Sequence, residues 1–291
     1  MKTDKLAKTF RVDGGKRFRL KDFDPSDTGH WRSKEHAAQA LQQGIARMAE
    51  LQDALYAQNR WALLLIFQAM DAAGKDGVIK HVMSGVNPQG CQVYSFKAPS
   101  DLELQHDFLW RTTRCLPERG HIGIFNRSYY EEVLVVRVHD EILQSQKIPE
   151  SLVGKNLWEE RFEDIRCFER HMARNGTVIR KFFLNVSRKE QKRRFLARLE
   201  QPGKNWKFSA ADIRERKCWD AYQEAYEAMI RNTASEHAPW YVVPADNKWF
   251  TRLVVSAVIV ATLESLHPAY PKVDEGKRKE LVAAKNQLLR K

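Results

Sequence analysis

The chain has 291 residues, of which 43% are hydrophobic and 10% aromatic, enough for a full core in one large domain or two small ones. No segment approaches the roughly 20 uninterrupted apolar residues that a membrane-spanning helix needs, and the N-terminal sequence lacks the apolar stretch of a secretion signal. The four cysteines are far apart and form no CxxC pair, so we expect a reduced, cytoplasmic protein.

Lysine and arginine outnumber aspartate and glutamate by 49 to 37, which gives a formal net charge of +12. Such an excess favours a polyanionic partner: a nucleic acid, an anionic membrane surface or a phosphate-rich substrate. A generic basic surface is the alternative. The location of the charge therefore matters more than its total.

Short apolar runs alternate with longer amphipathic segments along the chain. Residues 34–58 carry apolar side chains at helical spacing. Strands are then predicted at 61–67, 92–96, 121–125, 177–184 and 240–244, and helical patterns lie near 75–84, 100–116, 128–139, 156–175, 187–200, 210–232 and 247–266. The alternation predicts an α/β fold, a three-layer α/β/α sandwich on a parallel sheet. Phosphate ligands of such folds bind at the carboxyl ends of the strands.

No break in composition divides the chain into two domains. We expect residues 1–33, which are polar and irregular, to form an N-terminal arm that lies over the body. Residues 34–270 are assigned to one domain. Residues 271–291 are assigned to a peripheral C-terminal helix, because the pattern from Asp274 onward is charged and helical without a clear apolar face.

The stretch AMDAAGK, residues 69–75, follows the first predicted strand and precedes a predicted helix. Small residues allow backbone N–H groups to surround phosphate oxygens, and a helix N-terminus favours an anion. We therefore assign phosphate binding to Ala72, Ala73, Gly74 and Lys75. The alternative is an ordinary strand-to-helix turn, because the usual motif begins with Gly rather than Ala69.

The same loop lacks the Ser or Thr that ligates Mg²⁺ in nucleotide-binding loops, since Asp76 follows Lys75. Mg²⁺ prefers carboxylates together with waters and substrate phosphates. Asp71 and Asp76 are thus the predicted metal ligands, for Mg²⁺ or for Mn²⁺ in its place. The alternative for Asp76 is an acidic residue in the first helical turn, where the helix dipole favours it.

A second strand, in HIGIFNRSYYEEVLVVRVH (121–139), ends at Asn126 and Arg127. A guanidinium group there can bind phosphate oxygens with two N–H groups. A surface pair with Glu131, one turn away, is the alternative. We expect the tyrosines at 129–130 to pack in the core. Of Glu131 and Glu132, we expect one to face the site and the other to face solvent.

The basic segment, residues 187–210, begins at Ser187, which has capping-box spacing to Glu190. Between residues 188 and 198 the segment has one acidic residue, Glu190, and positive residues continue beyond Pro202-Gly203. They are Arg188, Lys189, Lys192, Arg193, Arg194, Arg198, Lys204 and Lys207. This one-signed charge predicts a polyanion clamp or a mobile lid over phosphates. Nucleic-acid binding would use the same charge pattern.

Taken together, the motifs FQAMDAAGKDG, SGVNPQG, FNRSYYE, NWKFS and PWYVVPADNKWFTR resemble the polyphosphate kinase 2 family, in family order from about Asp22 to Pro268. The resemblance implies a P-loop kinase fold, similar to thymidylate kinase, with a helical lid. It implies Mg²⁺-dependent transfer of the terminal phosphoryl group of inorganic polyphosphate to AMP or ADP, reversible in principle. Adenine nucleotides are the expected acceptors, with guanine nucleotides as further candidates, and the family suggests a homo-oligomer, a dimer or tetramer.

Carried over by position, Asp71, Lys75 and Arg127 match the family's catalytic residues. The pattern Asn126-Arg127-Ser128 with Glu131 is similar to the subgroup that accepts both AMP and ADP, although Tyr129 stands where His is more usual. We assign nucleotide binding to Asn126, Arg127, Glu131 and Asn87. Lys80, Arg193 and Arg194 join the loop as predicted polyphosphate ligands.

Phosphoryl transfer requires positioning and charge neutralisation more than covalent chemistry, so we expect direct in-line attack. No histidine has a recognisable nucleophile context, and no phospho-enzyme is expected. Two alternatives stay open: an ATP-dependent nucleotide kinase on the same fold, and a basic nucleic-acid-binding protein. Polyphosphate as the donor predicts neither a nucleic-acid nor a membrane partner.

Overall fold

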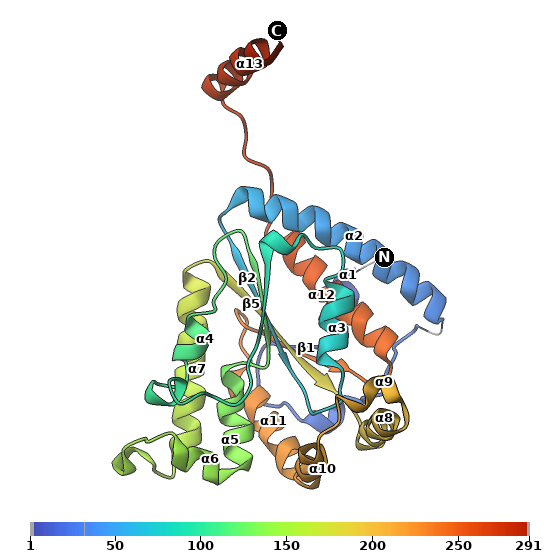
Figure 1. Cartoon of the computed structure of the whole chain (residues 1–291), viewed down its shortest axis with the longest axis vertical. Helices are drawn as coiled ribbons and strands as arrows, with labels where there is room; N and C mark the ends of the chain where they lie inside the picture. The colour runs from blue at the N-terminus through green and yellow to red at the C-terminus, as the bar shows by residue number, and fades with distance from the viewer. Residues whose placement is uncertain (1–2, 32, 290–291) are drawn as a thin grey trace.

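The computed structural model describes residues 3–31 and 33–289, and a six-stranded sheet forms its centre (Figure 1). The strands are β1 (Arg11–Val12), β2 (Ala62–Gln68), β3 (Cys91–Ser95), β4 (Ile122–Asn126), β5 (Thr177–Asn185) and β6 (Trp240–Pro244). Their order is β1-β6-β5-β2-β4-β3. β1 pairs antiparallel with β6, and the remaining pairs are parallel. The predicted parallel sheet is confirmed, with strand bounds within one residue of those expected.

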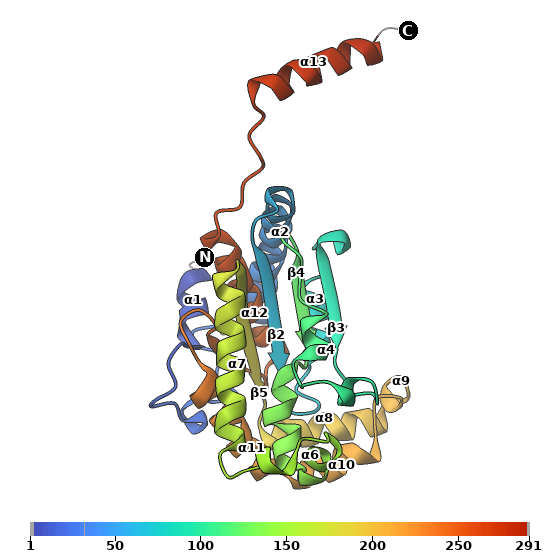
Figure 2. The ribbon, with the colours of Figure 1, turned by 90° about the vertical axis from the view of Figure 1, so that its left-hand side faces the viewer.

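Helices cover both faces of this sheet. The longer ones are α2 (Lys34–Gln58), α7 (Leu157–Arg174), α8 (Arg188–Glu200), α11 (Trp219–Thr233), α12 (Lys248–Ser265) and α13 (Glu275–Leu289). The shorter ones are α1 (Thr3–Thr9), α3 (Lys75–Val82), α4 (Trp110–Thr113), α5 (Val135–Val138), α6 (Asp140–Ser145), α9 (Pro202–Asn205) and α10 (Ala210–Lys217). Helices α1, α2 and α3 pack with α12 on one face, and α7 packs with α11 on the other (Figures 1 and 2). The three-layer α/β/α sandwich is therefore confirmed.

Burial on both faces explains the composition of the central strands. Every residue of β2, ALLLIFQ, is buried, as expected for a parallel strand covered by helices on both sides. Phe67 of β2 stacks on Phe182 of β5, with ring centroids 4.8 Å apart. The carboxyl ends of β2, β4 and β5 thus lie side by side on a rigid core.

The N-terminal arm contributes more structure than its polar sequence indicates. It forms α1, which packs against α12, and the edge strand β1. Phe10, Val12 and Phe18 are buried in the main hydrophobic core. Strand β1 was missed because two residues carry too little periodic signal for recognition.

Two of the predicted helices are mostly irregular. In place of a helix at 100–116, the chain forms a 3₁₀ turn, η3 (Glu103–Gln105), and the single turn α4. Glu103 accepts a hydrogen bond from the Ser100 amide at 2.7 Å, and Asp107 accepts one from the Leu109 amide at 2.9 Å. Such side-chain bonds to the backbone compete with a continuous helix. The pattern at 128–139 likewise forms a 3₁₀ turn, η4 (Tyr129–Val133), followed by α5.

Helix α13 projects away from the body at the end of an extended linker (Figures 1 and 2). All of its residues are exposed, as its mixed charged pattern indicated. Among the described helices, none has an apolar stretch long enough to cross a bilayer.

Candidate active site

The predicted phosphate loop, residues 69–74, connects the carboxyl end of β2 to the first turn of α3. Ala72 has φ +62° and Gly74 has φ +107°, both in the left-handed region. Gly74 adopts this region without a steric cost, whereas Ala72 has a Cβ and is strained in it, so the loop makes a sharp turn. Because β2 lies between β4 and β5, the loop occupies the middle of the carboxyl edge of the sheet.

Lys75 begins α3 and its side chain points back across the loop. Its Nζ donates a hydrogen bond to the Ala69 carbonyl at 2.9 Å. Burial lowers the pKa of Lys75, and the positive charge of Arg127 lowers it further, against the opposing effect of Asp71. A bound anion would therefore stabilise the protonated ammonium group.

Arg127 lies directly after β4 in a left-handed conformation, φ +65°. Its amide donates to the Phe67 carbonyl at 3.0 Å, which holds it against β2. Its guanidinium group lies 3.2 Å from Asp71 Oδ1 and 3.6 Å from Glu131 Oε2. Burial alone would lower the pKa of Arg127, but Glu131 and Asp71 together raise it. Arg127 is thus held as a cation beside the phosphate loop.

Gln68, the last residue of β2, supports this arrangement and was not singled out from the sequence. Its side chain is fully buried. In the orientation that satisfies both ends of its amide group, Gln68 donates to Glu131 Oε1 at 2.9 Å and accepts from Ser128 Oγ at 3.1 Å. Burial raises the pKa of Glu131, whereas Arg127 and Lys75 oppose that rise. Gln68 therefore fixes the segment that carries both Arg127 and Glu131.

Asp76 and Asn126 face each other at the carboxyl ends of β2 and β4. The Asn126 amide donates to Asp76 Oδ1 at 2.8 Å. Conventional loops have a hydroxyl after the lysine and a carboxylate at the end of the second strand. Here the carboxylate is on α3 and the neutral side chain is on the strand. The site thus keeps a carboxylate, but the carboxylate follows the loop lysine on α3 instead of ending the strand β4.

The carboxylates at this site suit a hydrated metal ion more than a fully protein-bound one. Within residues 3–31 and 33–289, no cluster of three or more His, Cys, Asp or Glu side chains could enclose a metal. Mg²⁺ usually binds through one or two carboxylates plus waters and substrate phosphates. Asp71 and Asp76 provide such a set, so the residues present fit Mg²⁺.

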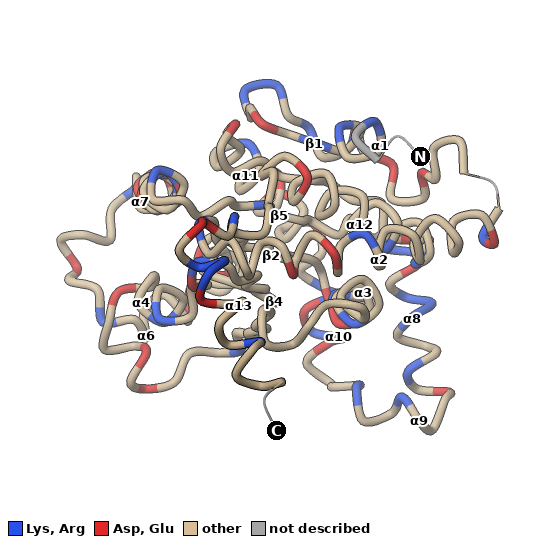
Figure 3. Tube along the Cα trace, turned by 90° about the horizontal axis from the view of Figure 1, so that it is seen from above, with Lys and Arg blue, Asp and Glu red and all other residues tan. Residues whose placement is uncertain are grey.

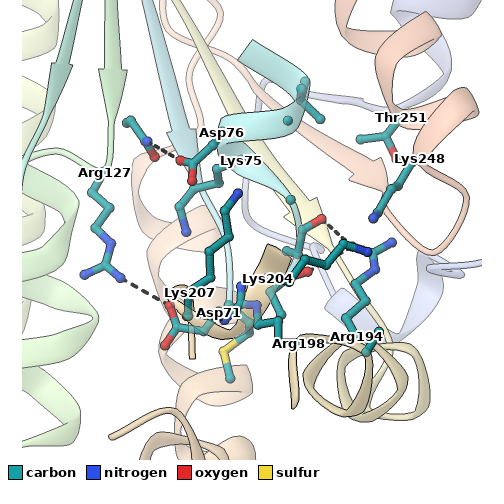
Figure 4. Close-up of a pocket in the computed structure, with 18 of the residues that line it drawn as sticks. Asp71, Lys75, Asp76, Arg127, Arg194, Arg198, Lys204, Lys207, Lys248 and Thr251 are labelled. Atoms are coloured by element: carbon teal, nitrogen blue, oxygen red, sulfur yellow. Dashed lines mark hydrogen bonds and ion pairs between the residues drawn. The ribbon is translucent and has the colours of Figure 1, made fainter. Parts of the chain in front are cut away.

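A basic cavity of about 700 Å³ opens in front of the loop (Figure 4). The basic segment contributes the side chains of Arg193, Arg194, Arg198, Lys204 and Lys207 to its lining. The body contributes Lys75, Lys97, Arg127, Lys248 and Arg252. Against these ten cations the lining has two acids, Asp71 and Asp76. Lys and Arg positions follow α8 and α9 at one side of the molecule (Figure 3). The net positive charge of the basic cavity therefore favours an anionic ligand.

Lys97, Lys248 and Arg252 were not assigned to the site from the sequence. Burial lowers the pKa of Lys248, and the nearby cations Arg194, Lys204 and Arg193 lower it further. The buried Nε of Arg252 has no hydrogen-bond partner among the described residues. Both observations indicate that this wall of the basic cavity is built to face an anion. Lys248 and Arg252 belong to the motif NKWFTR, whereas Lys97 lies outside the motifs; the position of all three beside the loop depends on the fold.

Arg194 was predicted to bind polyphosphate, and the structure gives it a different role. Its Nη1 donates to the Ala72 and Ala73 carbonyls at 3.0 and 2.5 Å. Its Nη2 donates to the Ala245 and Asp246 carbonyls, and its Nε donates to Glu190. All five N–H groups of the guanidinium are thus occupied. Arg194 lines the basic cavity and holds the outer side of the phosphate loop, with its N–H groups engaged within the protein.

The other predicted ligands divide between the cavity and the rest of the molecule. Arg193 lines the basic cavity, with a side chain 67% exposed and a double hydrogen bond to Glu190 at 2.6 Å. Lys80 is exposed on α3 and does not line the basic cavity, because it is more than a turn beyond Lys75. Asn87 caps a 3₁₀ turn before β3, so it lies at the amino edge of the sheet, opposite the loop. Neither Lys80 nor Asn87 joins the site.

The residues after Arg127 partly follow the prediction. Tyr129 and Tyr130 are buried and both donate to Glu169, which itself pairs with the buried Lys181 at 2.6 Å. Their predicted packing role is confirmed. Glu132 was expected to face solvent if Glu131 faced the site, and that expectation was wrong. Glu132 is 6% exposed and accepts a hydrogen bond from Arg161 at 2.5 Å.

An inner cavity of about 310 Å³ lies on the other side of Asp71 and Arg127. Glu131 lines it, together with Asp212 and Glu215 of α10. Glu215 accepts hydrogen bonds from Tyr222 at 2.6 Å and pairs with His139 Nε2 at 2.9 Å. Helix α10 therefore covers Arg127 on the side away from the basic cavity.

Comparisons with known proteins agree with this geometry. The family model of polyphosphate kinase 2 matches residues 30–271. A protein of Rhodopseudomonas palustris named ADP-polyphosphate phosphotransferase is 57% identical over 285 residues, 98% of this chain and 99% of the relative. A Meiothermus ruber protein named AMP/ADP-polyphosphate phosphotransferase is 45% identical over 276 residues, 94% of this chain and 99% of the relative.

The structural comparison gives the same result. The crystal structure of polyphosphate kinase 2 from Arthrobacter aurescens superimposes with a TM-score of 0.87 at 40% sequence identity. The match covers 96% of this chain and 96% of that one.

Proposed function

The chain belongs to the polyphosphate kinase 2 family, and we propose that it transfers the terminal phosphoryl group of inorganic polyphosphate to AMP and ADP. The observation that carries this proposal is the basic cavity, in which ten cations surround a phosphate loop. A donor made of phosphate alone offers negative charge along its whole length and no base to recognise. A cavity lined by cations matches that donor.

On this proposal the end of the polyphosphate chain binds at the loop, with Lys75 on its terminal phosphate. Lys97, Arg193, Lys248 and Arg252 contact the phosphates behind it. Arg194 acts indirectly, since it holds the Ala72 and Ala73 carbonyls and so fixes the loop. Cations on several elements allow a flexible chain to bind without a fixed conformation.

The acceptor phosphate binds on the Arg127 side of the loop. One of its oxygens attacks the terminal phosphorus in line with the bridging oxygen of the donor. A P–O bond to the acceptor forms as the bridging P–O bond breaks, and the shortened chain leaves as an anion. The attacking phosphate oxygen is already ionised near neutral pH, so no general base is required. Lys75 and Arg127 neutralise the charge of the transferred group, and the same steps run in reverse.

Asp71 and Asp76 would hold Mg²⁺, or Mn²⁺ in its place, against the substrate phosphates. The ion supplies further charge neutralisation to the transferred group when bound. Asn126 keeps Asp76 oriented through their hydrogen bond at 2.8 Å. Arg127 keeps Asp71 oriented in the same way, at 3.2 Å.

The direct test is to incubate the purified protein with Mg²⁺, polyphosphate and either AMP or ADP, with no ATP supplied, and to follow ADP and ATP by chromatography. We expect both acceptors to be phosphorylated. A protein that phosphorylates AMP from ATP but not from polyphosphate would be an ATP-dependent kinase on this fold. A protein that turns over neither donor but binds duplex or single-stranded DNA, also after Lys75→Ala, would be a nucleic-acid-binding protein.

A further inference from the structure

The face of the sheet that α7 and α11 cover contains a buried polar cluster, which we call the tyrosine network. Its members are the hydroxyls of Tyr129 and Tyr130, the carboxylate of Glu169 on α7, the ammonium group of Lys181 on β5 and the carbonyl of Thr233 at the end of α11. Each of these residues is at most 1% exposed. The mechanism proposed above uses none of them.

Hydrogen bonds in the tyrosine network use all of its donors. The hydroxyls of Tyr129 and Tyr130 both donate to Glu169 Oε1, at 2.9 and 2.7 Å. Lys181 Nζ donates to Glu169 Oε2 at 2.6 Å and to the Tyr130 hydroxyl at 2.9 Å. Its third N–H bond donates to the Thr233 carbonyl at 2.9 Å. Burial raises the pKa of both tyrosines well above the ordinary value, and the charge of Glu169 raises it further, so both hydroxyls stay protonated.

Stability alone does not account for this network. The cost of removing two charges from water can exceed the energy of their attraction, so apolar side chains of similar volume often stabilise a core equally well. Apolar side chains can also shift against one another. Hydrogen bonds depend on distance and angle, and a fully satisfied network therefore favours one arrangement. The effect of the tyrosine network is thus expected in the geometry of the segment that it holds.

That segment is the turn η4, which begins two residues after Arg127. Arg127 has φ +65°, a strained conformation that persists only where the surrounding structure holds the backbone. At the start of the turn, Gln68 holds Ser128. Further along, the tyrosine network holds the two hydroxyls. Glu131 directly follows Tyr130 and lies 3.6 Å from the guanidinium group of Arg127, so a shift of Tyr130 would displace both charged groups.

We propose that Glu169 is a positioning residue for phosphoryl transfer: through the hydroxyls of Tyr129 and Tyr130 it fixes η4, and the fixed turn holds Arg127 beside the phosphate loop. This inference rests on the proposed function, which gives Arg127 its role at the transferred group. Glu169 lines neither the basic nor the inner cavity, so it acts only through the tyrosines. A misplacement of about 1 Å at a reaction centre can lower the rate about 100-fold.

An apolar form of the tyrosine network separates positioning from stability. The combined variant Tyr129→Phe, Tyr130→Phe, Glu169→Leu and Lys181→Met removes the polar side-chain groups and nearly keeps their volume. Its melting temperature should stay close to that of the wild type, since no side-chain charge or hydroxyl remains buried without a partner. Its kcat with ADP should fall at least about tenfold, while the KM for polyphosphate stays within about twofold. A wild-type kcat in this variant would overturn the proposal.

Two milder variants and a control complete the series. Glu169→Gln with Lys181→Met keeps an oxygen that accepts from both tyrosines, so kcat should stay within about twofold of the wild type. Tyr129→Phe removes one hydrogen bond and should lower kcat about fivefold. Thr262→Val is the control, because it also deletes one buried hydroxyl, which accepts from Arg180 at 3.0 Å on the opposite face of the sheet. The control should retain the wild-type kcat, and an equal loss in all three would refute a positioning role.

Arg127→Ala shows whether the effect depends on Arg127. In that background Tyr129→Phe has no guanidinium group left to misplace and should change kcat less than about twofold. The same fivefold loss with and without Arg127 would contradict the proposal, since the hydroxyl would then act on another part of the site.

Failure of the proposed function can be separated from failure of this inference. A wild-type protein that transfers no phosphoryl group from polyphosphate would refute the function alone. Hydrogen exchange then examines the turn directly, without substrates. In the apolar variant the amides of residues 127–131 should exchange at least about tenfold faster than in the wild type, and those of β2 at an unchanged rate. Equal exchange of 127–131 in both proteins would show that the tyrosine network does not fix the turn.

Discussion

A cavity of about 380 Å³ between the 99–111 segment and α7, called the acidic cavity, differs in charge from the basic cavity, and Arg111 in its lining donates a hydrogen bond to the Lys97 carbonyl of the basic cavity. The basic cavity has ten cations and two acids in its lining, whereas the acidic cavity has five carboxylates and two guanidinium groups. On the proposed function both substrates are anions, so positive charge alone could not tell them apart. The excess of carboxylates in the acidic cavity disfavours a chain of phosphates there. The basic cavity is thus the part of the molecule whose charge matches a chain of phosphates.

The sharpest comparison within the basic cavity uses two lysines on one helix. Lys75→Ala removes the ammonium group at the loop and should lower kcat/KM with polyphosphate by at least about 100-fold, the cost of losing one transition-state contact. Lys80→Ala, one and a half turns further along α3, should retain wild-type activity because Lys80 is outside the cavity. Steady-state kinetics with both variants checks this. Equal losses would show that α3 as a whole, and not the loop, attracts the donor.

The role of the Asp76 carboxylate in metal binding can be tested by exchanging the side chains at positions 76 and 126. Asp76→Asn should weaken the apparent affinity for Mg²⁺ by about tenfold or more, read from a Mg²⁺ titration of kcat. Asn126→Asp alone places two carboxylates at the 2.8 Å contact and should also reduce activity. The double variant restores one carboxylate and one amide. It should recover about tenfold relative to the sum of the single effects, and strictly additive losses would contradict a shared metal site.

Arg193 and Arg194 separate substrate contact from loop support. Arg194→Ala leaves four backbone carbonyls without a donor and should lower the free energy of unfolding by about 2 kcal/mol or more. Activity should fall with either acceptor. Arg193→Ala breaks one exposed pair and should leave the melting temperature unchanged while it raises the KM for polyphosphate. A normal melting temperature for Arg194→Ala would contradict the loop-support role.

The lowered pKa of Lys75 predicts an alkaline limit on donor use. As the pH rises through this pKa, below the ordinary lysine value, kcat/KM for polyphosphate should fall. Unfolding does not explain such a loss, because in this window the unfolded chain binds more protons than the folded one. The contribution of Lys75 to stability therefore increases with pH. Lys75→Arg should move the limit to higher pH, and an unshifted profile would assign it to another group.

Salt should produce the smallest of these effects. It should change the kinetic constant of the charged donor more than that of an uncharged ligand. The KM for polyphosphate should rise about threefold or more between about 0.05 and 0.3 M salt, because the cations of the basic cavity are screened. The inhibition constant (Ki) of adenosine against ADP carries no such charge term, because adenosine has no phosphate, and should stay nearly constant. Parallel salt dependence of both constants would contradict the assignment of polyphosphate to the basic cavity.

The features that could be predicted from the sequence are those determined by short segments of the chain. Short apolar runs identified the parallel strands; β2, β4 and β6 are almost fully buried and contain few polar residues, whereas the partly exposed edge strand β3 was recognised from its β-branched and aromatic residues. The loop and Arg127 were found because each directly follows such a run. The edge strand β1 and the irregular 100–116 segment were not predicted, since two residues or a few side-chain bonds to the backbone decide them.

What the sequence could not provide were the partners of each charge. Arg193 and Arg194 are neighbours of identical chemistry, and only the fold shows that one is exposed and the other is surrounded by carbonyls. Glu132 looked like a solvent-facing partner of Glu131 until Arg161 was brought to it from α7. The acidic cavity combines segments from Pro99 to Asp164 and has no sequence signature of its own.

The clamp formed by Arg194 also concerns how this protein is made. The phosphate loop is a short local turn, but its carbonyls bind a side chain more than 120 positions later, which in turn reaches to Asp246. During synthesis the ribosome must therefore release nearly the whole domain before the loop can take its final shape. Contacts of such long sequence separation form late. We expect the nascent chain to stay inactive until it is almost finished, with no early fragment able to consume polyphosphate.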